Sequence, residues 1–139
     1  MDDITLPPDY RPTAKEEFMN PRQREYFRRK LISWKEEILR DAQETLQHLQ
    51  QETSNAADIA DRASTESDRS IELRTRDRQR KLIAKIDAAL RRIEDGSYGF
   101  CEETGEPISL QRLEARPIAT LSLEAQERHE RRERVYRDD

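Results

Sequence analysis

The stretch "QQETSNAADIADRAS", residues 50–64, lies inside the longest part of the chain that lacks helix breakers. No proline or glycine occurs between Pro21 and Gly96, which leaves 74 uninterrupted residues. Ser54 and Asn55 fall near the middle of this run, and both residue types favour caps and turns over helix interiors. The sequence therefore predicts two long helices folded back on each other as an antiparallel hairpin. Two separate helices paired in an intermolecular dimer are the alternative.

Apolar residues recur on both sides of this interruption at helical spacing. They are Phe27, Leu31, Trp34, Ile38, Leu46 and Leu49 before it, and Ile71, Leu82 or Ile83, Ile86, Leu90 and Ile93 after it. Spacings of three, four, seven or eight residues place side chains on one face of a helix. The two stripes are therefore predicted to face each other in a coiled coil over residues 21–95, with a tip at about residues 52–63.

Cap signals indicate how the N-terminal part of the chain is organised. Thr13 and Glu16 fit a capping box, which predicts a short helix within an N-terminal segment, residues 1–20. The first long helix is expected to begin after a cap at Asn20, with Pro21 at its first position and Gln23 two residues later.

Two further helices are predicted after the hairpin. Ser109 can cap a short helix over "LQRLEA", within a small domain at residues 96–121, and Ser122 can cap a last helix in residues 122–139. The last helix carries three pairs at the spacing that favours ion pairing, and we expect them to form a solvated face. These pairs are Glu124–Arg128, Glu127–Arg131 and Glu130–Arg134.

Composition excludes several classes of protein. A charged fraction of 40% against 33% hydrophobic residues is typical of long helices exposed over most of their surface. One cysteine cannot form an internal disulfide, and "DDITLPPDY" after Met1 is not an export signal. No apolar stretch is long enough to span a membrane. We expect a cytoplasmic protein, and a hairpin that buries its own stripe gives no reason to expect more than a monomer.

Charge is segregated along the predicted hairpin. Residues 22–40 and 74–92 together hold fifteen Lys or Arg against five Asp or Glu, whereas residues 41–68 hold seven acidic residues against one arginine. The net charge is −4, and aromatic residues do not interleave with the basic ones, which argues against nucleic acid as a direct partner. An acidic tip on a basic shaft is typical of a probe that enters a cation-lined pore. A solvated rod with arbitrary charge blocks is the alternative.

The tip motif "DIADRA" places Asp58 and Asp61 three residues apart at the start of the second helix. Carboxylates at a helix N-terminus are stabilised by free amides and by the helix dipole, so capping is one explanation. Two carboxylates at a solvent-exposed tip are also able to reach a hydrated Mg²⁺, which proteins hold through one or two carboxylates and water. Both explanations stay open.

Several motifs together resemble the DksA/TraR family. They are "DIADRA" with Asp58, Asp61 and Ala63, "ELRTRDRQRKLIAKI" from Glu72 to Ile86, "YGFC" and "RLEARPIATL", and the resemblance covers nearly the whole chain from Phe18 onward. It implies a bacterial transcription factor that binds RNA polymerase directly, without DNA contact, and inserts its coiled-coil tip through the secondary channel toward the catalytic centre. It also implies action with the alarmone ppGpp in the stringent response and at ribosomal RNA promoters.

The same resemblance concerns zinc. Members of the family typically carry C-x2-C-x17-C-x2-C, and these positions fall here on Cys101, Thr104, Ser122 and Ala125. Three thiolate ligands are therefore missing, and His129 has no partner histidine near it. We expect a zinc-ribbon-like domain without zinc, with Cys101 as a small buried residue. Its fold would rest on other packing, for which the candidates are Tyr98, Phe100, Ile108, Leu110, Leu113, Ile118 and Leu121.

For the alarmone, the family pattern falls on Lys85 and Arg116, with Leu82 beside them. An ammonium and a guanidinium suit phosphate, the first as a point charge and the second as a fork. A third basic position of the family is Gln126 here, which puts the affinity for the alarmone in doubt.

Catalytic motifs are missing from the sequence, which has no Ser-His-Asp set and no glycine-rich phosphate loop. We expect a protein that is not an enzyme. The alternatives are a Gre-like secondary-channel factor, which would promote transcript cleavage, and a structural coiled-coil adaptor.

Overall fold

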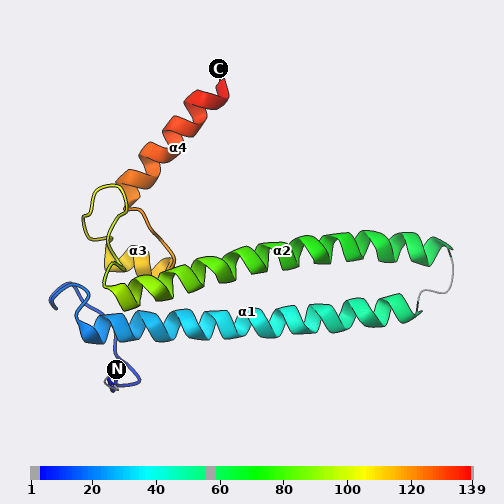
Figure 1. The fold of residues 1–139 in the computed structure, drawn as a ribbon, viewed down its shortest axis with the longest axis horizontal. Coiled ribbons are helices and arrows are strands. Elements are labelled where there is room, and N and C mark those ends of the chain that lie inside the picture. The colour runs from blue at the N-terminus through cyan, green and yellow to red at the C-terminus, as the bar shows by residue number, and fades with distance from the viewer. Residues whose placement is uncertain (1–3, 56–58, 139) are drawn as a thin grey trace. The chain divides into compact units, whose positions relative to one another are not determined.

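The computed structural model describes the backbone of residues 4–55 and 59–138 and the side chains of residues 4–51 and 66–135. Four helices make up most of it: α1 (Pro21–Asn55), α2 (Ile59–Asp95), α3 (Leu110–Ala115) and α4 (Leu123–Asp138). Helices α1 and α2 lie side by side and run in opposite directions (Figure 1). The predicted mainly α fold with a long antiparallel hairpin is therefore confirmed. Within the described ranges the β structure is limited to one antiparallel bridge, between Phe100 and Pro107.

Contacts divide the chain into two compact units. The first unit consists of Met1–Leu31 and Ala88–Asp139, and the second unit of Ile32–Asp87. Both units contain a part of α1 and a part of α2. The division into domains at residues 20, 95 and 121 stays a prediction.

The start of α1 has the cap that the sequence predicts. The Gln23 backbone N–H donates to Oδ1 of Asn20 at 3.0 Å, and Pro21 is the first helical residue. The Gln23 side chain is fully buried. Its Oε1 accepts from the Met19 N–H at 2.8 Å and its Nε2 donates to the Thr13 carbonyl at 3.3 Å. This carboxamide therefore joins the N-terminal segment to α1 through satisfied polar contacts.

The prediction of a short helix after Thr13 is wrong. The capping-box contact itself is present, because the Thr13 N–H donates to Oε1 of Glu16 at 3.1 Å. Only turns follow, however. Met19 has a φ of 52°, which a right-handed helix cannot accommodate, and Asn20 already caps α1. The cap signal was correct, but too few residues separate it from the next cap.

In the second unit, the stripes of α1 and α2 face each other as predicted over most of their length. Ile38, Leu49 and Ile86 are buried, and Trp34, Leu46, Leu82 and Ile83 are half-buried. Polar pairs also connect the helices: Lys35 Nζ lies 2.7 Å from Oδ1 of Asp87, and His48 Nδ1 lies 2.9 Å from Oε1 of Glu72.

Ile71 departs from the predicted stripe. Its side chain is 55% exposed. Steps of seven residues, two helical turns, back from the buried Ile86 reach Gln79 and then Glu72, both half-buried, rather than Ile71. The prediction was wrong because the interior face of α2 becomes polar in this part of the helix.

The first unit contains the larger apolar core. Its buried residues are Met19, Phe27, Leu31, Ala89, Ile93, Tyr98, Cys101, Ile108, Leu113, Ile118, Ala119 and Ala125. Leu110 and Leu121 are half-buried. Phe100 was predicted to be in the core but is 37% exposed. Its ring packs edge to face on Phe18 at a centroid distance of 5.4 Å, so the N-terminal segment covers it on one side.

The caps of α3 and α4 match the prediction. The Arg112 N–H donates to Oγ of Ser109 at 3.1 Å, and the Ala125 N–H donates to Oγ of Ser122 at 3.2 Å. The solvated face predicted for α4 is confirmed, because all six side chains of the three pairs are exposed, and none of the pairs is an ion pair among the described side chains. Arg128 lies instead 3.7 Å from Oε2 of Glu103, because the first turns of α4 pack beside the loop that carries this residue.

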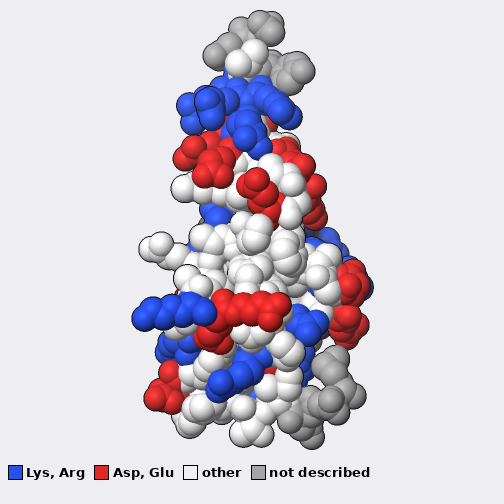
Figure 2. Space-filling model, turned by 90° about the vertical axis from the view of Figure 1, so that its left-hand side faces the viewer, with Lys and Arg blue, Asp and Glu red and all other residues white. Residues whose placement is uncertain are grey.

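Charge is polarised along α4. Figure 2 shows basic side chains gathered toward the C-terminal end of this helix and acidic ones nearer its start. This order complements the helix dipole. None of the helices in the described part of the chain combines the length and the apolar character that a membrane span requires.

Candidate functional site

The candidate tip residues lie at or next to the start of α2. Asp58 is outside the described residues. Asp61 and Ala63 are the third and fifth residues of α2, which begins at Ile59, and their side chains are outside the described set. A carboxylate in a first helical turn is stabilised by the dipole, whatever else it does. The capping and functional explanations of Asp61 therefore both remain.

The candidate alarmone residues are distributed over both units. Lys85 is exposed and Leu82 half-buried on α2, in the second unit. Arg116 belongs to the first unit, where it caps the C-terminus of α3. Its backbone N–H donates to the Arg112 carbonyl at 2.7 Å, and its own carbonyl accepts from the Ala119 N–H at 3.0 Å. The backbone at Arg116 is thereby fixed, while its side chain is exposed.

Lys85 and Arg116 differ from several neighbouring cations in having no partner among the described side chains. Lys30 pairs with Glu114, Lys35 with Asp87 and Lys81 with Asp77. Among the side chains that the structure describes, neither Lys85 nor Arg116 makes an ion pair or a side-chain hydrogen bond. Both charges are therefore available to an anionic ligand.

Gln126 takes the place of a third family cation. It is half-buried in the first turn of α4, and its Nε2 donates to Oε1 of Glu130 at 3.2 Å. A neutral amide already bonded to a carboxylate adds no positive charge for a phosphate.

The loop at Cys101 keeps the outline of a metal-binding turn. The Cys101 N–H donates to the Glu106 carbonyl at 2.8 Å, and the Gly105 N–H donates back to the Cys101 carbonyl at 2.8 Å. The Ile108 N–H donates to the Gly99 carbonyl at 2.7 Å. These backbone bonds close a tight hairpin loop around Cys101.

The thiol of Cys101 has donors around it in place of other thiolates. The residue is buried, as predicted, with 2% of its surface exposed. Burial raises the pKa of the thiol, but the Thr104 hydroxyl and the backbone N–H groups of Ser122, Thr104 and Glu103 outweigh this effect and lower the pKa to about 6. Hydrogen bonds therefore stabilise the thiolate form of Cys101 without a metal.

The other three family positions do not fit zinc. Ala125 has no donor atom and is fully buried, while the Ser122 hydroxyl caps α4. Thr104 uses its hydroxyl oxygen to accept from the Glu106 N–H at 3.2 Å. Zinc in structural sites takes four Cys or His ligands, and no group of three or more His, Cys, Asp or Glu residues gathers in the described parts of the chain.

His129 does not complete such a site. It is exposed, as predicted, and its Nε2 lies 3.4 Å from Oε1 of Glu103. Together with Arg128 it links α4 to the loop after Cys101.

The sequence analysis did not single out Arg76 and Gln79, which line a groove between α1 and α2 in the second unit. The signal that was available is the helical spacing from Ile86, which leads along the inner face of α2 to Gln79.

Two family models match this chain. The model described as DnaK suppressor protein DksA, N-terminal domain, matches residues 23–93, and the prokaryotic dksA/traR C4-type zinc finger matches residues 96–131. The second match covers the four degenerate zinc positions.

Curated relatives and a solved structure extend these matches over almost the whole chain. A Caulobacter vibrioides protein (strain NA1000 / CB15N) named RNA polymerase-binding transcription factor DksA is 75% identical over 131 residues, which is 94% of this chain and 92% of the relative. The Escherichia coli (strain K12) protein of the same name is 42% identical over 125 residues, 90% and 83% of the two chains. The structure of transcription factor DksA2 from Pseudomonas aeruginosa matches this chain with a TM-score of 0.80 at 43% identity. The match covers 88% of this chain and 93% of the DksA2 chain. With both family models matched in order and relatives aligned over nearly its full length, this chain belongs to the DksA family.

Proposed function

We propose that this chain is a transcription factor that binds RNA polymerase directly. The observation that carries the proposal is the 75% identity, over 94% of the chain, to a relative whose name states this function. The hairpin supports it, because the 43% identical DksA2 structure has the same fold over 88% of this chain.

The chain enters the secondary channel of the polymerase with the tip of the hairpin first. Support comes from the charge pattern, with fifteen basic against five acidic residues in the paired segments 22–40 and 74–92, and seven acidic against one arginine in residues 41–68. Asp58, Asp61 and Ala63 then act near the active site of the polymerase, where negative charge alters the electrostatics around the catalytic metal. The result is control of transcription initiation, including ribosomal RNA promoters in the stringent response.

The alarmone ppGpp is the proposed effector, held at the polymerase interface with Lys85, Arg116 and Leu82 as contacts. The support is chemical. Both cations are exposed and unpaired within the described side chains, and phosphate oxygens are strong acceptors for such groups. Because Gln126 replaces a third cation, the response to ppGpp is weaker than in a member that carries all three.

The chain acts by binding rather than by catalysis. It works as a monomer, in the cytoplasm where its polymerase is, and regulates without binding DNA itself. The net charge of −4 supports the last point, because direct DNA binding depends on neutralising phosphates.

Binding of the purified chain to purified core RNA polymerase tests the proposal. We expect a one-to-one complex in size-exclusion chromatography, and a shortened open-complex lifetime at a ribosomal RNA promoter that shortens further with ppGpp. Absence of binding contradicts the proposal. Binding accompanied by cleavage of stalled transcripts would indicate a Gre-like factor, and binding without any effect on transcription an adaptor.

A further inference from the structure

A pocket of about 360 Å³ lies in the first unit, between the start of α1, the end of α2 and the N-terminal segment. This volume is at the lower end of the range, about 300 to 1,000 Å³, that is typical of small-molecule sites. The pocket therefore suits a small metabolite. Its lining residues are Ile4, then Pro21, Arg24, Glu25 and Arg28 of α1, and Ile93 and Glu94 of α2.

Two of the four charged side chains at the pocket neutralise each other. Glu25 is buried, and its two carboxylate oxygens accept from Arg28 at 2.8 Å and 2.9 Å. Arg29 also donates to Glu25, at 2.8 Å, and its guanidinium donates to the Ile4 carbonyl at 2.8 Å. This cluster therefore ties the N-terminal segment to α1 and holds one wall of the pocket in place.

The other two charged side chains, Arg24 and Glu94, have no partner among the side chains that the structure describes. Neither makes an ion pair or a side-chain hydrogen bond there, with the other or with a third residue. Nε of Arg24 is moreover enclosed without a hydrogen-bond partner, which costs stability that a bound acceptor would offset. A guanidinium from α1 and a carboxylate from α2 thus line one pocket unpaired.

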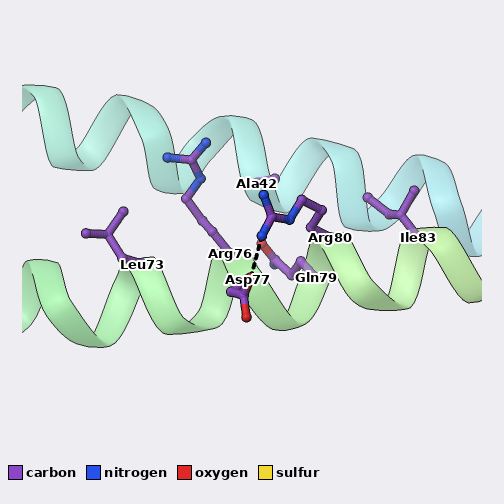
Figure 3. A pocket seen from close by; sticks show the side chains of 7 residues that line it. All are labelled: Ala42, Leu73, Arg76, Asp77, Gln79, Arg80 and Ile83. Atoms are coloured by element: carbon purple, nitrogen blue, oxygen red, sulfur yellow. Dashed lines mark hydrogen bonds and ion pairs between the residues drawn. The ribbon is translucent and has the colours of Figure 1, made fainter.

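The groove between the helices of the second unit differs in this respect (Figure 3). The carboxylate that lines it, Asp77, lies 2.6 Å from Arg80 and 3.1 Å from Lys81. That carboxylate is already matched, so the groove does not offer separate places for a cation and an anion.

Aliphatic surface completes the pocket of the first unit. Ile93 is buried, Ile4 is half-buried, and Pro21 adds the ring of the first residue of α1. Contact with such a surface favours an apolar group of a ligand. A ligand with several negative charges suits the pocket less well, because the carboxylates of Glu25 and Glu94 would repel it. The lining fits a zwitterion with an aliphatic part.

We propose that this pocket binds a free α-amino acid with an aliphatic side chain. The carboxylate of the ligand pairs with Arg24, and its ammonium pairs with Glu94. Its side chain packs on Ile4, Pro21 and Ile93. Because these residues come from the N-terminal segment and from both long helices, the bound ligand stabilises the folded first unit. The free chain carries every group involved, so this inference does not depend on the binding of polymerase.

Titration of the purified full chain with L-leucine, followed by calorimetry, tests the site. We expect saturable binding of about one L-leucine per chain and a melting temperature that rises with the L-leucine concentration. Three analogues each lack one part of the ligand: isocaproate lacks the ammonium, isoamylamine lacks the carboxylate, and glycine lacks the side chain. Each should bind about tenfold more weakly, the scale of a lost hydrogen bond to a charged group or of a lost apolar contact.

Two substitutions and two matched controls assign the charges. Arg24→Gln and Glu94→Gln should each weaken the binding of L-leucine about tenfold. Arg91→Gln and Glu17→Gln make the same changes at exposed residues of the first unit that do not line the pocket, and they should bind as the wild-type chain does. Thermal melts without ligand check that all four variants are folded.

The analogue series uses only the wild-type chain, so it decides the question even where a variant fails to fold. A wild-type chain that does not bind L-leucine would overturn the proposal. Equal affinities for L-leucine and isocaproate would also overturn it, because Glu94 would then have no part in recognition. Undiminished binding of L-leucine by folded Arg24→Gln and Glu94→Gln would place the ligand elsewhere on the chain.

Discussion

The backbone N–H of Ala125 donates a hydrogen bond to Oγ of Ser122 at 3.2 Å. Both residues stand where the family typically has zinc ligands, and here they form the cap of α4 instead. The local geometry that holds the helix in place is therefore built from a hydroxyl and a backbone amide, and the buried methyl of Ala125 fills the space beside them. A helix cap of this kind contributes about 1 kcal/mol, far less than the apparent ~10 to 16 kcal/mol of a structural zinc in a small finger.

We predict that the purified protein contains no stoichiometric zinc and keeps its fold in a strong chelator. The triple variant Thr104→Cys, Ser122→Cys and Ala125→Cys should bind about one zinc per chain, because it restores four thiolates, two on the Cys101 loop and two at the start of α4. Elemental analysis of both proteins measures this. About one zinc in the wild-type protein would contradict the prediction.

The contacts of Glu114 predict that the stability of the protein depends on pH in the acid range. Burial raises the pKa of its carboxyl, but hydrogen bonds from the Tyr26 hydroxyl and from Lys30 lower it below the usual value overall. This contribution to stability is complete above the pKa of an unfolded glutamate, about 4.3, and is lost as the pH falls through the lower folded value. Glu114→Gln should therefore destabilise the protein at pH 7, and the destabilisation should be smaller at pH 3.

Urea unfolding at both pH values measures the difference. Glu36→Gln is the matched control, since Glu36 is an exposed residue of α1 without an ion-pair partner among the described side chains. An equal effect of both substitutions at pH 7 would show that the Tyr26 and Lys30 contacts contribute nothing.

The close packing of Met19 and Phe18 on Gly99 predicts that substitutions at this glycine lower the stability of the protein. Its φ is 91°, and a Cβ built on it would lie 3.1 Å from Met19 and 3.2 Å from Phe18. Gly105 also has a positive φ, 73°, but has no atom within 4 Å of such a Cβ. Gly105→Ala should therefore cost about 1 kcal/mol for the backbone alone, whereas Gly99→Ala should cost more because Met19 must move.

Thermal denaturation of both variants separates backbone strain from crowding. Met19→Ala should reduce the stability less in the Gly99→Ala background than in the wild-type protein. In that background, removal of the Met19 side chain also relieves its crowding against the new methyl group. Additive losses in the double variant would argue against the contact between Met19 and Gly99 as the cause.

The extent to which the sequence predicts this structure differs between elements. Caps at Asn20, Ser109 and Ser122 were correct because capping depends on residues only a few positions apart. The apolar stripes were correct where both helices keep apolar residues facing each other, as at Ile38 and Ile86. Ile71 was placed wrongly because its position follows from the register of α2 against α1, and that register brings Glu72 to His48.

Non-local contacts account for the other differences. Arg128 pairs with Glu103, a residue 25 positions away, in preference to its helical neighbour Glu124. Phe100 is covered by Phe18 from one side only. Sequence spacing contains no information about either contact. Of the candidate sites, the residue types came from the resemblance to a family, whereas only the structure shows that Lys85 and Arg116 have no partner among the side chains it describes.

Lys85 and Arg116 give a prediction about the alarmone. If both hold phosphate at the polymerase interface, Lys85→Ala and Arg116→Ala should each abolish the additional effect of ppGpp on open-complex lifetime and spare the effect of the protein alone. The two side chains are exposed, so their removal should leave the melting temperature unchanged. Gln126→Lys should strengthen the response by adding a cation. A ppGpp response that persists in both alanine variants would refute the site.

The tip gives the sharpest separation between a structural and a functional role. Asp58→Asn and Asp61→Asn remove charge and keep shape, and asparagine caps a helix about as well as aspartate. Stability should then change by no more than a fraction of the ~1 kcal/mol that a cap contributes. If the carboxylates act electrostatically near the catalytic metal of the polymerase, the double variant should still bind polymerase through the rest of the chain but should no longer shorten the open-complex lifetime at a ribosomal RNA promoter. Polymerase affinity, open-complex lifetime and thermal melts measure binding, regulation and folding separately. Regulation at the wild-type level by the double variant would leave Asp58 and Asp61 with capping as their only role, because the loss of two negative charges cannot be neutral for a group that works through its charge.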